Sequence, residues 1–598
     1  MENFAVKQMV PDQIFTDRQP FIDHFYKLAL NAIDQKTSST VLLGHRRMGK
    51  TEIFRRVVNR LFFEQDVNKS CCIPVYYEFP KEISNRNDFA IDYLTNFLKW
   101  YTAFKMRNEN IIIQLEVPQD LIEFIQNNIP NTVGINASIS LLKGLIKNTV
   151  PLPEQKALKS PSIVANYDNI AIAMFLDEFQ NTSLPQYNYS IVGYMKEPVE
   201  SINCPHFVTG STMSILSDEI LGKGALYGRF DYEHIKPLTP YYSEELVLKA
   251  ANYYEITLSH PMASHIALRC GGNPFYINSV IRQAARKNIS IDSLKALDKI
   301  MVIDICSGFI WGELSDQVNF WISRINQYGI TRWILYLAAL EENEQDINIQ
   351  RIQAQLKLKE NIDVSLDKIK EVLIKLARGD LLEYKAFGDW FGKIQDPVLN
   401  EFLKVWGLIE IERQEISIVQ EQSLVKLQRT KKQFDEYKGY ISEVFIAQFL
   451  WNTQGQTFSG HYFNSKTDVK VSDYFFYIDQ RVRQSAGKNM EVDIYAAADN
   501  EIWLIESKCW KKPVGNDVVL KLFEQSKHVQ QRNKEDIRSI KLWIFANEGL
   551  TESAKKLCEQ HKILWSSKDN LNGLLEKAKL RKLPDIPFYL QETSTIYD

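Results

Sequence analysis

Residues 39–51 read STVLLGHRRMGKT, a short β-rich run that passes directly into a glycine-containing loop. The loop fits the pattern GxxxxGK[ST], and the amphipathic stretch EIFRRVVNRLFF follows it. Glycines let the backbone wrap with its N–H groups facing phosphate oxygens, and the positive end of the following helix strengthens that attraction. At this spacing Lys50 reaches the β- and γ-phosphates of a nucleotide and Thr51 coordinates Mg²⁺. The predicted nucleotide-binding residues of the loop are Gly44, Arg47, Gly49, Lys50 and Thr51.

A second apolar run, NIAIAMFLDEFQN at 169–181, ends in two acids and has the composition of a central parallel strand. Acids at the carboxyl end of a buried strand lie where α/β sheets bind their ligands. We expect Asp177 in the Mg²⁺ shell and Glu178 as the general base that polarises the attacking water. An acidic strand end is also common without any function, so this prediction depends on the phosphate loop.

Two further candidates accompany the next expected strand, HFVTGSTMSIL at 206–216. Thr209, Ser211 or Thr212 at its tip either contacts the γ-phosphate or is an ordinary turn hydroxyl; Ser211 is our choice for the nucleotide. Arg229, in the segment ALYGRF, is either a surface arginine or an arginine finger that stabilises the transferred charge. We include it among the candidate catalytic residues.

Six short motifs are spread over the first half of the chain: FTDRQPFIDHFYKLAL (15–30), GHRRMGKT, FLDEF, GST, LYGR and GGNPFYI (271–277). Their order resembles that of prokaryotic archaeal-type ATPases, AAA+-related members of the STAND group of signal-transduction ATPases. The resemblance covers roughly residues 10–320. It implies ATP as the nucleotide and a homo-oligomer formed through the ATPase domain.

The resemblance also implies a helical lid in which a Gly-x-Pro element touches the nucleotide. Gly272, Asn273 and Pro274 match that element, and Pro274 is the expected contact. The same residues fit a helix C-cap followed by a stop, and both interpretations are compatible. Residues 106–168 depart from the family pattern, which leaves the number of sheet strands open.

The middle of the chain has the pattern of a winged helix. TRWILYLAAL (331–340), INIQRIQAQL (347–356) and SLDKIKEVLIKLARGDLLEY (365–384) carry apolar residues at helical spacing, and two short strands are expected around a turn at 387–389. A DNA-reading winged helix carries basic side chains on its third helix, and here that helix is only weakly basic. We therefore favour a packing role over DNA reading, with a polar helical spacer at 409–433.

The last part of the chain predicts a second kind of site. A helix at 434–451 carries Glu443, a strand is expected at 469–479, and two β-rich runs at 490–513 flank the turn Asp499-Asn500. If this turn is a two-residue hairpin loop, paired residue numbers sum to 999 and Asp493 faces Glu506. Lys508 shares their face of the sheet.

Two carboxylates directly opposite each other need a cation between them, and hard oxygen ligands suit Mg²⁺ or Mn²⁺. The alternative is that Glu491, opposite Lys508 in the same register, forms an ion pair in a purely structural hairpin. Acids on opposite faces of the sheet, or an ammonium that fills the gap between them and leaves no room for a metal, would overturn the phosphodiesterase prediction.

Helix, strand, hairpin and the three side chains together resemble the PD-(D/E)xK nuclease superfamily, over roughly residues 434–570. The resemblance implies that Asp493 and Glu506 bind the catalytic metal and that Lys508 positions or activates the water. Glu443 matches the acid on the first helix and is included among the metal ligands. The proline that often precedes the first acid is absent, since Glu491-Val492 stands there.

Composition limits the other classes of function. With 598 residues, 45% hydrophobic and 24% charged, the chain has ordinary globular composition, and a net charge of −3 neither supports nor opposes nucleic-acid binding. The seven cysteines include no CxxC pair, so no disulfide framework or zinc site is expected. No signal peptide and no apolar run of about 20 residues is present, which predicts a cytoplasmic protein without a membrane span.

Together these patterns predict a multidomain α/β protein: a P-loop NTPase of AAA+/STAND type with helical lid, a winged helix and a C-terminal α/β restriction-endonuclease-like domain. The expected function is an ATP-controlled, metal-dependent DNA endonuclease, with RNA as substrate still open and a role in prokaryotic defence implied by the resemblance. The alternative is a non-cleaving, ATP-switched DNA-binding regulator that keeps the nuclease-like fold for docking. The expected segments are the ATPase core 1–240, lid 241–325, winged helix 326–408, linker 409–433, nuclease-like domain 434–570 and tail 571–598.

Overall fold

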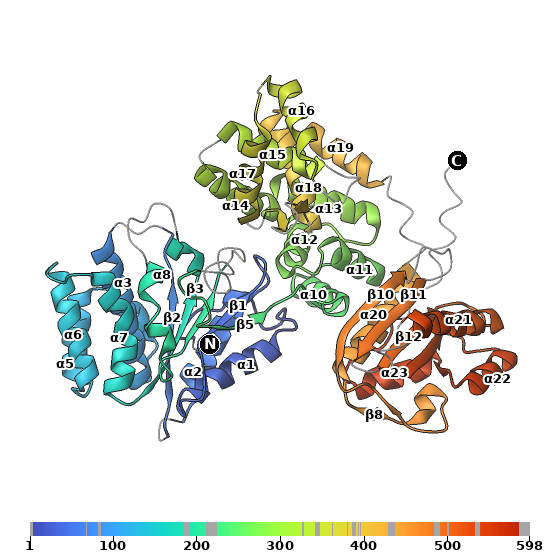
Figure 1. Ribbon diagram of the computed structural model, residues 1–598, viewed down its shortest axis with the longest axis horizontal. Coiled ribbons are helices and arrows are strands. Elements are labelled where there is room, and N and C mark those ends of the chain that lie inside the picture. The colour runs from blue at the N-terminus through green and yellow to red at the C-terminus, as the bar shows by residue number, and fades with distance from the viewer. Residues whose placement is uncertain are drawn as a thin grey trace. The chain divides into compact units, whose positions relative to one another are not determined.

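The computed structural model describes the following residues: 4–66, 69–81, 85–183, 191–210, 224–325, 328–340, 347–361, 363–378, 381–385, 390–392, 394, 396–428, 437–483, 491–498, 501–532 and 539–584. The chain divides into two compact units (Figure 1). The first unit comprises Met1–Leu238, Glu245–Thr257 and Ile266–Leu424. The second unit comprises Thr239–Glu244, Leu258–His265 and Val425–Asp598.

The first unit is built on a five-stranded sheet in the order β2-β3-β4-β1-β5. All neighbouring strands run parallel, and β3 is buried along its whole length, as expected of a strand covered on both faces. The α/β fold with a parallel sheet is therefore confirmed. The strands are β1 (Thr40–Leu43), β2 (Cys72–Glu78), β3 (Ala171–Asp177), β4 (His206–Thr209) and β5 (Asp231–His234).

Aromatic side chains lock two helices onto one face of this sheet. Phe54 of the helix after the glycine-rich loop packs edge-to-face on Phe25 (ring centroids 5.4 Å apart) and on Phe175 of β3 (5.3 Å). Phe207 of β4 completes the cluster at 4.9 Å from Phe175. The two helices are α1 (Gln19–Asn31) and α2 (Lys50–Phe63).

The segment 106–168, which the sequence left unassigned, adds helices and no strand to the sheet. It lies between β2 and β3, where a parallel crossover connection is required. Helices α5, α6 and α7 pack against α3 (Figure 1). The helices of this crossover are α3 (Arg86–Met106), α4 (Asn110–Gln114), α5 (Pro118–Asn128), α6 (Val133–Ile146) and α7 (Pro153–Tyr167). Short helical turns follow β3 at η1 (Phe179–Ser183), α8 (Ile191–Tyr194) and η2 (Pro198–Glu200).

A helical region forms most of the remainder of the first unit, although residues 239–244, 258–265 and 425–428 within it belong to the second unit. The three helices and the hairpin expected between 326 and 408 are present as α15, α16, α17 and the antiparallel pair β6–β7. The third helix ends at Arg378 rather than at 384, since Glu383 already belongs to β6. The elements are α10 (Pro240–Tyr253), α11 (His260–Arg269), α12 (Pro274–Lys287), α13 (Leu294–Ser307), α14 (Phe309–Ile325), α15 (Tyr328–Leu340), α16 (Ile349–Glu360), α17 (Leu366–Arg378), β6 (Glu383–Lys385), β7 (Trp390–Gly392), α18 (Pro397–Trp406), η4 (Gly407–Ile411) and α19 (Ile416–Gln428).

The second unit contains a mixed sheet in the order β10-β11-β12-β13-β14. The pairs β10–β11 and β11–β12 are antiparallel, whereas β12–β13 and β13–β14 are parallel. The strand expected at 469–479 is broken: β9 ends at Lys470 and β10 begins at Phe475. The strands are β8 (Thr457–Phe458), β9 (Val469–Lys470), β10 (Phe475–Arg483), β11 (Glu491–Ala498), β12 (Glu501–Lys508), β13 (Ser539–Ala546) and β14 (Leu564–Ser566).

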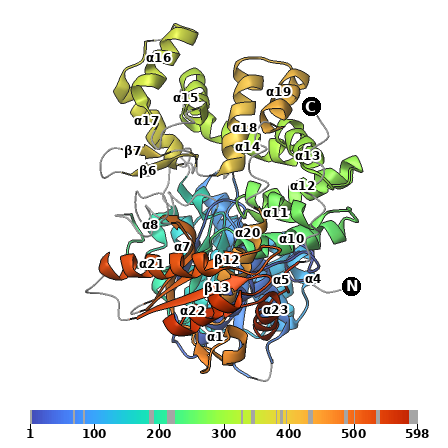
Figure 2. The same cartoon turned by 90° about the vertical axis from the view of Figure 1, so that its right-hand side faces the viewer.

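Helices cover both faces of this sheet. Phe449 of α20 and Leu571 of α23 share one core with Trp503 and Trp543, while Leu522 of α21 belongs to the core on the other face. Figure 2 shows α21 in front of β12 and β13, which it contacts. The helices are α20 (Tyr437–Asn452), η6 (Gly460–Phe463), α21 (Asn516–Arg532), α22 (Glu552–His561) and α23 (Lys568–Lys577).

Three sequence expectations about boundaries and chemistry meet the structure here. Helix α23 spans position 570, at which we placed a domain boundary. All seven cysteines are free thiols. Among the described residues no helix combines the length and apolarity needed to cross a bilayer.

Candidate functional site

The glycine-rich loop leaves the carboxyl end of β1 and turns into α2. At Gly44 a Cβ atom would stand 2.2 Å from Cγ2 of Ile235 and 2.7 Å from its carbonyl oxygen, so this close approach of β1 and the end of β5 requires glycine. Gly49 caps α2 with φ +94°, a left-handed conformation that glycine adopts without strain. The two glycines of the pattern are therefore explained by backbone geometry.

Lys50 is held inside its own loop. Its side chain is buried, and Nζ donates hydrogen bonds to the carbonyl oxygens of Gly44 (2.6 Å) and His45 (2.7 Å). Thr51 follows in the first turn of α2 and is half-buried. The loop thus positions an ammonium and a hydroxyl at the positive end of a helix.

Asp177 and Glu178 lie at the same edge of the sheet as the loop, because the carboxyl ends of parallel strands share an edge. The Asp177 carboxylate is buried and accepts hydrogen bonds from the Tyr76 hydroxyl (3.0 Å) and from the Glu178 amide (2.8 Å). Burial and the charge of Asp177 raise the pKa of Tyr76, which keeps its hydroxyl a donor. Sequence reasoning missed Tyr76. Its only signal was a tyrosine within the apolar run that forms β2, the strand next to β3 in the sheet.

Glu178 is oriented by an unusual backbone. Its φ of +52° is left-handed, and its carboxylate accepts a hydrogen bond from the Gln180 amide. Burial and the neighbouring Asp177 raise the pKa of Glu178, while Gln180 and Arg46 act in the opposite direction. A raised pKa makes the carboxylate a stronger base, which suits the predicted role.

Arg47, predicted to line a phosphate, makes contacts that the sequence did not predict. Its guanidinium lies 4.0 Å from the centre of the Phe275 ring and forms an ion pair with Glu313 of α14. Burial and the like charge of Arg46 lower the pKa of Arg47 to about 9, which leaves it charged at neutral pH. The loop is thereby tied to two helices of the helical region.

Pro274 begins α12, as both interpretations of GGNP require. Asn273 caps the helix by accepting a hydrogen bond from the Phe275 amide (3.0 Å), and Gly271 and Gly272 have positive φ values of +56° and +70°. The helix start therefore reaches the glycine-rich loop through Phe275 and Arg47. No contact joins Pro274 itself to the loop among the interactions of the described residues.

The remaining candidates of this site separate into two groups. Ser211 and Thr212 lie outside the described residues, while the Thr209 hydroxyl donates to the Leu42 carbonyl (3.1 Å) and ties β4 to β1. Arg229 forms an ion pair with Glu200 (2.9 Å) on the surface. In the part of the chain that the structure describes, these contacts do not bring Arg229 to the glycine-rich loop.

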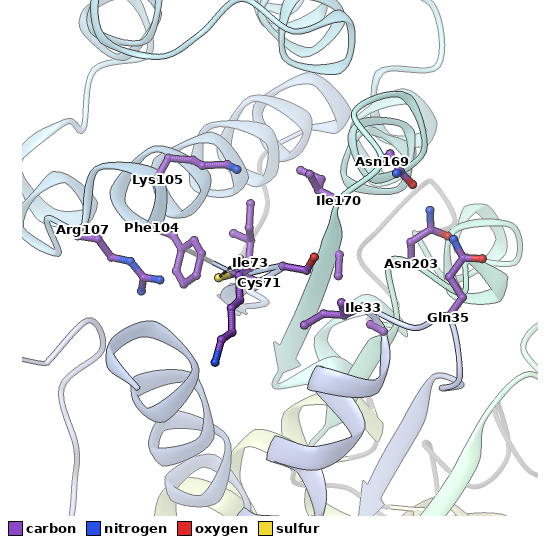
Figure 3. A pocket seen from close by; sticks show the side chains of 14 residues that line it. Ile33, Gln35, Cys71, Ile73, Phe104, Lys105, Arg107, Asn169, Ile170 and Asn203 are labelled. Carbon is purple, nitrogen blue, oxygen red and sulfur yellow. Dashed lines mark hydrogen bonds between the residues drawn. The ribbon is translucent and has the colours of Figure 1, made fainter. Parts of the chain in front are cut away.

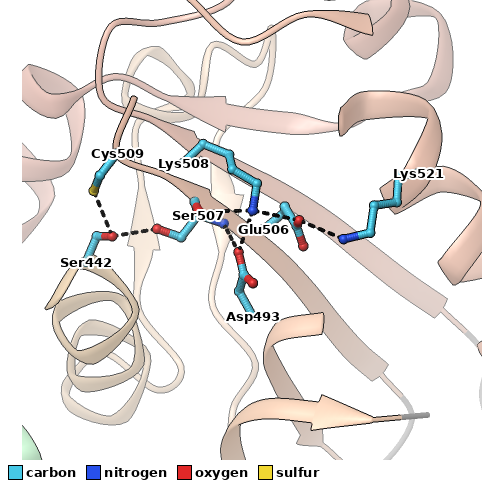
Figure 4. A network of polar contacts seen from close by, with 7 residues as sticks. All are labelled: Ser442, Asp493, Glu506, Ser507, Lys508, Cys509 and Lys521. Atoms are coloured by element: carbon cyan, nitrogen blue, oxygen red, sulfur yellow. Dashed lines mark hydrogen bonds and ion pairs between the residues drawn. The ribbon is translucent and has the colours of Figure 1, made fainter. Parts of the chain in front are cut away.

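The second candidate site has the register that the sequence predicted. Ile494 pairs with Ile505 and Ala497 with Ile502, so paired numbers sum to 999. One step further, an oxygen of Asp493 accepts hydrogen bonds from the Ser507 amide (2.7 Å) and from Nζ of Lys508 (3.1 Å). Asp493 and Glu506 therefore lie on one face of the sheet, together with Lys508 (Figure 4).

The cation between the two acids is the Lys508 ammonium itself. Its Nζ is 2.8 Å from Oε1 of Glu506, which is 1% exposed. Burial lowers the pKa of Lys508, but attraction to Glu506 and Asp493 outweighs burial and raises it. This corrects the expectation that the acids need a metal to be neutralised. The side chain of Glu491, the alternative partner of Lys508, lies outside the described residues.

The residues fit a metal ion in one respect and fail to in another. Oε2 of Glu506 is buried and has no hydrogen-bond partner, so this oxygen has a free ligand position. However, the described residues contain no group of three or more His, Cys, Asp or Glu side chains that could hold a metal. A metal bound here would take two protein carboxylates and would have to displace the ammonium.

Two further elements contribute polar groups to this site. Lys521 of α21, which sequence reasoning missed, places Nζ 3.2 Å from Oε1 of Glu506 (Figure 4). On the other face the Ser442 hydroxyl contacts the Ser507 hydroxyl (2.6 Å) and the Cys509 thiol (3.1 Å). Glu443 follows Ser442 on α20, the helix that covers the face opposite to the acids. Burial raises the pKa of Cys509, and the charge of Glu443 adds to that rise.

A cavity of about 400 Å³ lies at the opposite edge of the first sheet, beside the amino ends of β2 and β3 (Figure 3). Ile73, Ile170 and Phe104 form its apolar part, and Lys105 and Arg107 lie at its rim. It is separated from Asp177 by the length of β3, so it is not part of either candidate site.

Comparison with known proteins gives a fold likeness only. No family model matches the chain, and no curated protein matches it. Similar solved structures include a Walker-type ATPase of Pyrococcus abyssi, at 14% identity over 67% of this chain and 99% of that chain with TM-score 0.44. The ORC2 protein of Aeropyrum pernix is 12% identical over 70% of this chain and 98% of that chain, with TM-score 0.39. The RuvB Holliday junction branch migration motor of Thermotoga maritima is 13% identical over 63% of this chain and 92% of that chain, with TM-score 0.30. These values are too low to add to what the residues themselves indicate.

Proposed function

We propose that the first unit binds ATP with Mg²⁺ and hydrolyses it. The observation that carries this proposal is the loop geometry: Gly49 in a left-handed cap and Lys50 held inside the loop at the start of α2. Thr51 and Asp177 are oxygen donors of the kind that Mg²⁺ takes together with nucleotide phosphates. Both stand at the carboxyl edge of the sheet.

The chain's own groups suffice for the other parts of the reaction. Lys50 stabilises charge on the β- and γ-phosphates, and Mg²⁺, when bound, neutralises the phosphate oxygens. Glu178 accepts a proton from the attacking water, which its raised pKa favours. Arg47 adds positive charge beside the loop.

Phosphate release from ATP tests this first part. We expect Mg²⁺-dependent release by the wild-type chain, with Glu178→Gln binding a fluorescent ATP analogue normally while losing turnover by at least 100-fold. Glu116→Gln, an exposed acid in the crossover segment, is the matched control. Undiminished turnover in Glu178→Gln would show that Glu178 is not the general base.

We further propose that the second unit cleaves phosphodiester bonds of DNA with a divalent metal. The carrying observation is that Asp493, Glu506 and Lys508 meet on one face of the sheet, with one buried oxygen of Glu506 unpartnered. Asp493 and Glu506 would hold Mg²⁺ or Mn²⁺, and a metal supplies charge stabilisation at the phosphorus. Lys508, released from the acids, would orient the attacking water.

The competing function is a regulator that binds nucleic acid without cutting it. The ion pairs favour this alternative, because Lys508 and Lys521 already balance the charges of Asp493 and Glu506. In this case the second unit is a docking module. In both versions the nucleotide state of the first unit controls the second, a homo-oligomer forms through the ATPase part, and a role in prokaryotic defence follows from the resemblance alone.

Incubation with plasmid DNA separates the two functions. The purified chain is mixed with supercoiled plasmid in Mg²⁺, Mn²⁺ or EDTA, each with and without ATP, and binding is measured in parallel by gel shift. We expect nicking that needs a metal and responds to ATP. Binding without cleavage under every condition would favour the regulator and overturn the nuclease proposal.

A further inference from the structure

A pair of stacked tyrosines lies on the sheet of the second unit. The rings of Tyr477 in β10 and Tyr495 in β11 are 6.0 Å apart between centroids and nearly parallel, with an interplanar angle of 10°. Tyr495 is 7% exposed, whereas Tyr477 is 45% exposed. Because β10 is the edge strand, one side chain of the pair is fixed and the other faces solvent.

The pair lies on the same face as the carboxylate cluster. Paired residues of antiparallel strands project to one face, and side chains alternate along a strand. Tyr495 pairs with Leu504 of β12, and Asp493 and Glu506 are each two positions further along their strands. Two strand positions span about 6.6 Å. Tyr477 pairs with Ala497, four positions from Asp493, which corresponds to about 13 Å along the strands. Helix α21 packs over β12 and β13, while Tyr477 remains exposed on β10.

Positive charge gathers at the carboxyl end of β12, on the far side of the acids from the tyrosine pair. Lys508 ends the strand, exposed Lys511 and Lys512 follow it, and Lys521 reaches Glu506 from α21. An aromatic platform followed along the sheet by ammonium groups is a combination that proteins use for unpaired nucleotides: a base stacks on the ring and the backbone phosphates further along the strand meet the charges. Bases inside a duplex have no free ring face to offer.

We propose that Tyr477 stacks an unpaired nucleobase on the face of the sheet that carries the carboxylate cluster, about 13 Å along the strands from Asp493, so that the substrate is single-stranded nucleic acid or a duplex with unpaired nucleotides. The proposal rests on the nuclease function proposed above and defines its substrate class. Tyr495 supports the platform from below, and the lysines at the end of β12 take the phosphates on the strand leading to the cluster.

Binding in EDTA tests the platform separately from cleavage. Fluorescence anisotropy compares a labelled single-stranded 20-mer with a blunt duplex of the same sequence, for the wild type, Tyr477→Ala and Tyr477→Phe. One base–aromatic stack contributes about 1–3 kcal/mol, which corresponds to a roughly 5- to 150-fold change in affinity. We expect Tyr477→Ala to weaken single-strand binding by that factor and Tyr477→Phe to retain it.

Tyr474→Ala is the matched control, because Tyr474 is also an exposed aromatic (62%) but precedes β10 and lies outside the Tyr477–Tyr495 stack. Equal binding of single strand and duplex, or unchanged single-strand affinity in Tyr477→Ala, would overturn the platform. So would loss of a dimer in Tyr477→Ala on gel filtration, since edge strand β10 would then serve pairing between copies. Tyr477-dependent binding without any cleavage supports the platform and overturns the nuclease. If duplex DNA is cleaved equally well by the wild type and by Tyr477→Ala, the nuclease is supported and the platform is overturned.

Discussion

Lys50 depends on its own loop for position, since two backbone carbonyls hold its ammonium. We predict that Lys50→Ala loses at least 10-fold in ATP affinity, because the charge that meets the β- and γ-phosphates is removed. Titration of a fluorescent ATP analogue measures this affinity. Lys36→Ala, at an exposed position before β1, should bind normally. Normal affinity in Lys50→Ala would count against the phosphate-loop assignment.

Among the described residues, Lys508 is the cation that pairs with both Asp493 and Glu506. Lys508→Met leaves Asp493 facing Glu506 with only Lys521 to offset their charge, which should destabilise the second unit by roughly 3 kcal/mol. If the acids bind metal, Mn²⁺ should restore much of this loss and should stabilise the variant more than the wild type. Urea unfolding with and without Mn²⁺ gives both quantities, and Lys555→Met, on an exposed ion pair, serves as control. No response of the variant to Mn²⁺ would point to a purely structural cluster.

At this scale the sequence predicted what short-range geometry determines. A two-residue turn sets the pairing of a hairpin, so Asp493 and Glu506 could be placed opposite each other from the sequence alone. Lys521 and Glu313 could not be found in this way. Each approaches its partner from a different helix, and only the packing of the helices decides such contacts.

At the scale of elements, the glycine-rich loop is tied to α14 by the Arg47–Glu313 ion pair. If Arg47 also serves a phosphate, Glu313 competes with the nucleotide for it. We predict that Glu313→Gln raises ATP affinity about 3- to 10-fold, an effect on the scale of one desolvated ion pair. The same titration measures it, with Glu123→Gln, a change of an exposed acid in α5, as the control. An unchanged affinity would mean that Arg47 serves only the packing of α14.

The junction of α13 and α14 predicts a pH dependence. Asp304 accepts a hydrogen bond from the Ile310 amide (3.1 Å), and burial raises its pKa from 3.8 to about 6 although backbone hydrogen bonds oppose the shift. The folded state therefore binds this proton more tightly than the unfolded state, so the contribution of Asp304 to stability is greatest below pH 4 and is lost as the pH rises through 6. Asp304→Asn removes this term and should gain about 2 kcal/mol over the wild type between pH 4.5 and 7. Urea midpoints across that range measure the difference, and a constant difference would contradict the shift.

Helices and strands were predicted best where the regular spacing of apolar residues is uninterrupted and polar or turn-forming residues mark both ends. The strands around the glycine-rich loop and β3 follow from this. The third helix of the middle region was predicted to be too long because the helical spacing of apolar residues continues through Leu381 and Leu382. These two residues are buried in the bend before β6 instead. The strand at 469–479 was drawn unbroken because residues 471–474 lie between two strands of matching composition.

At the scale of the whole molecule, each candidate site lies within one unit. The glycine-rich loop, Asp177 and Glu178 belong to the first unit, and Asp493, Glu506 and Lys508 belong to the second. The division itself was beyond the sequence, because two short segments near residues 240 and 260 join the second unit. Tyr241, for example, packs its ring 5.1 Å from that of Phe445. Contacts between segments so far apart in the chain produce no periodic pattern in the sequence.

We propose ATP turnover and DNA cleavage as two separate activities of one chain. The most direct test is to assay both activities side by side in the wild type and in Asp493→Ala, with Mg²⁺ and ATP present. We predict that the variant no longer nicks plasmid DNA while its ATP hydrolysis stays within about 2-fold of the wild type, since additivity holds for sites without shared partners. Loss of both activities together, or nicking that persists in Asp493→Ala, would contradict the account.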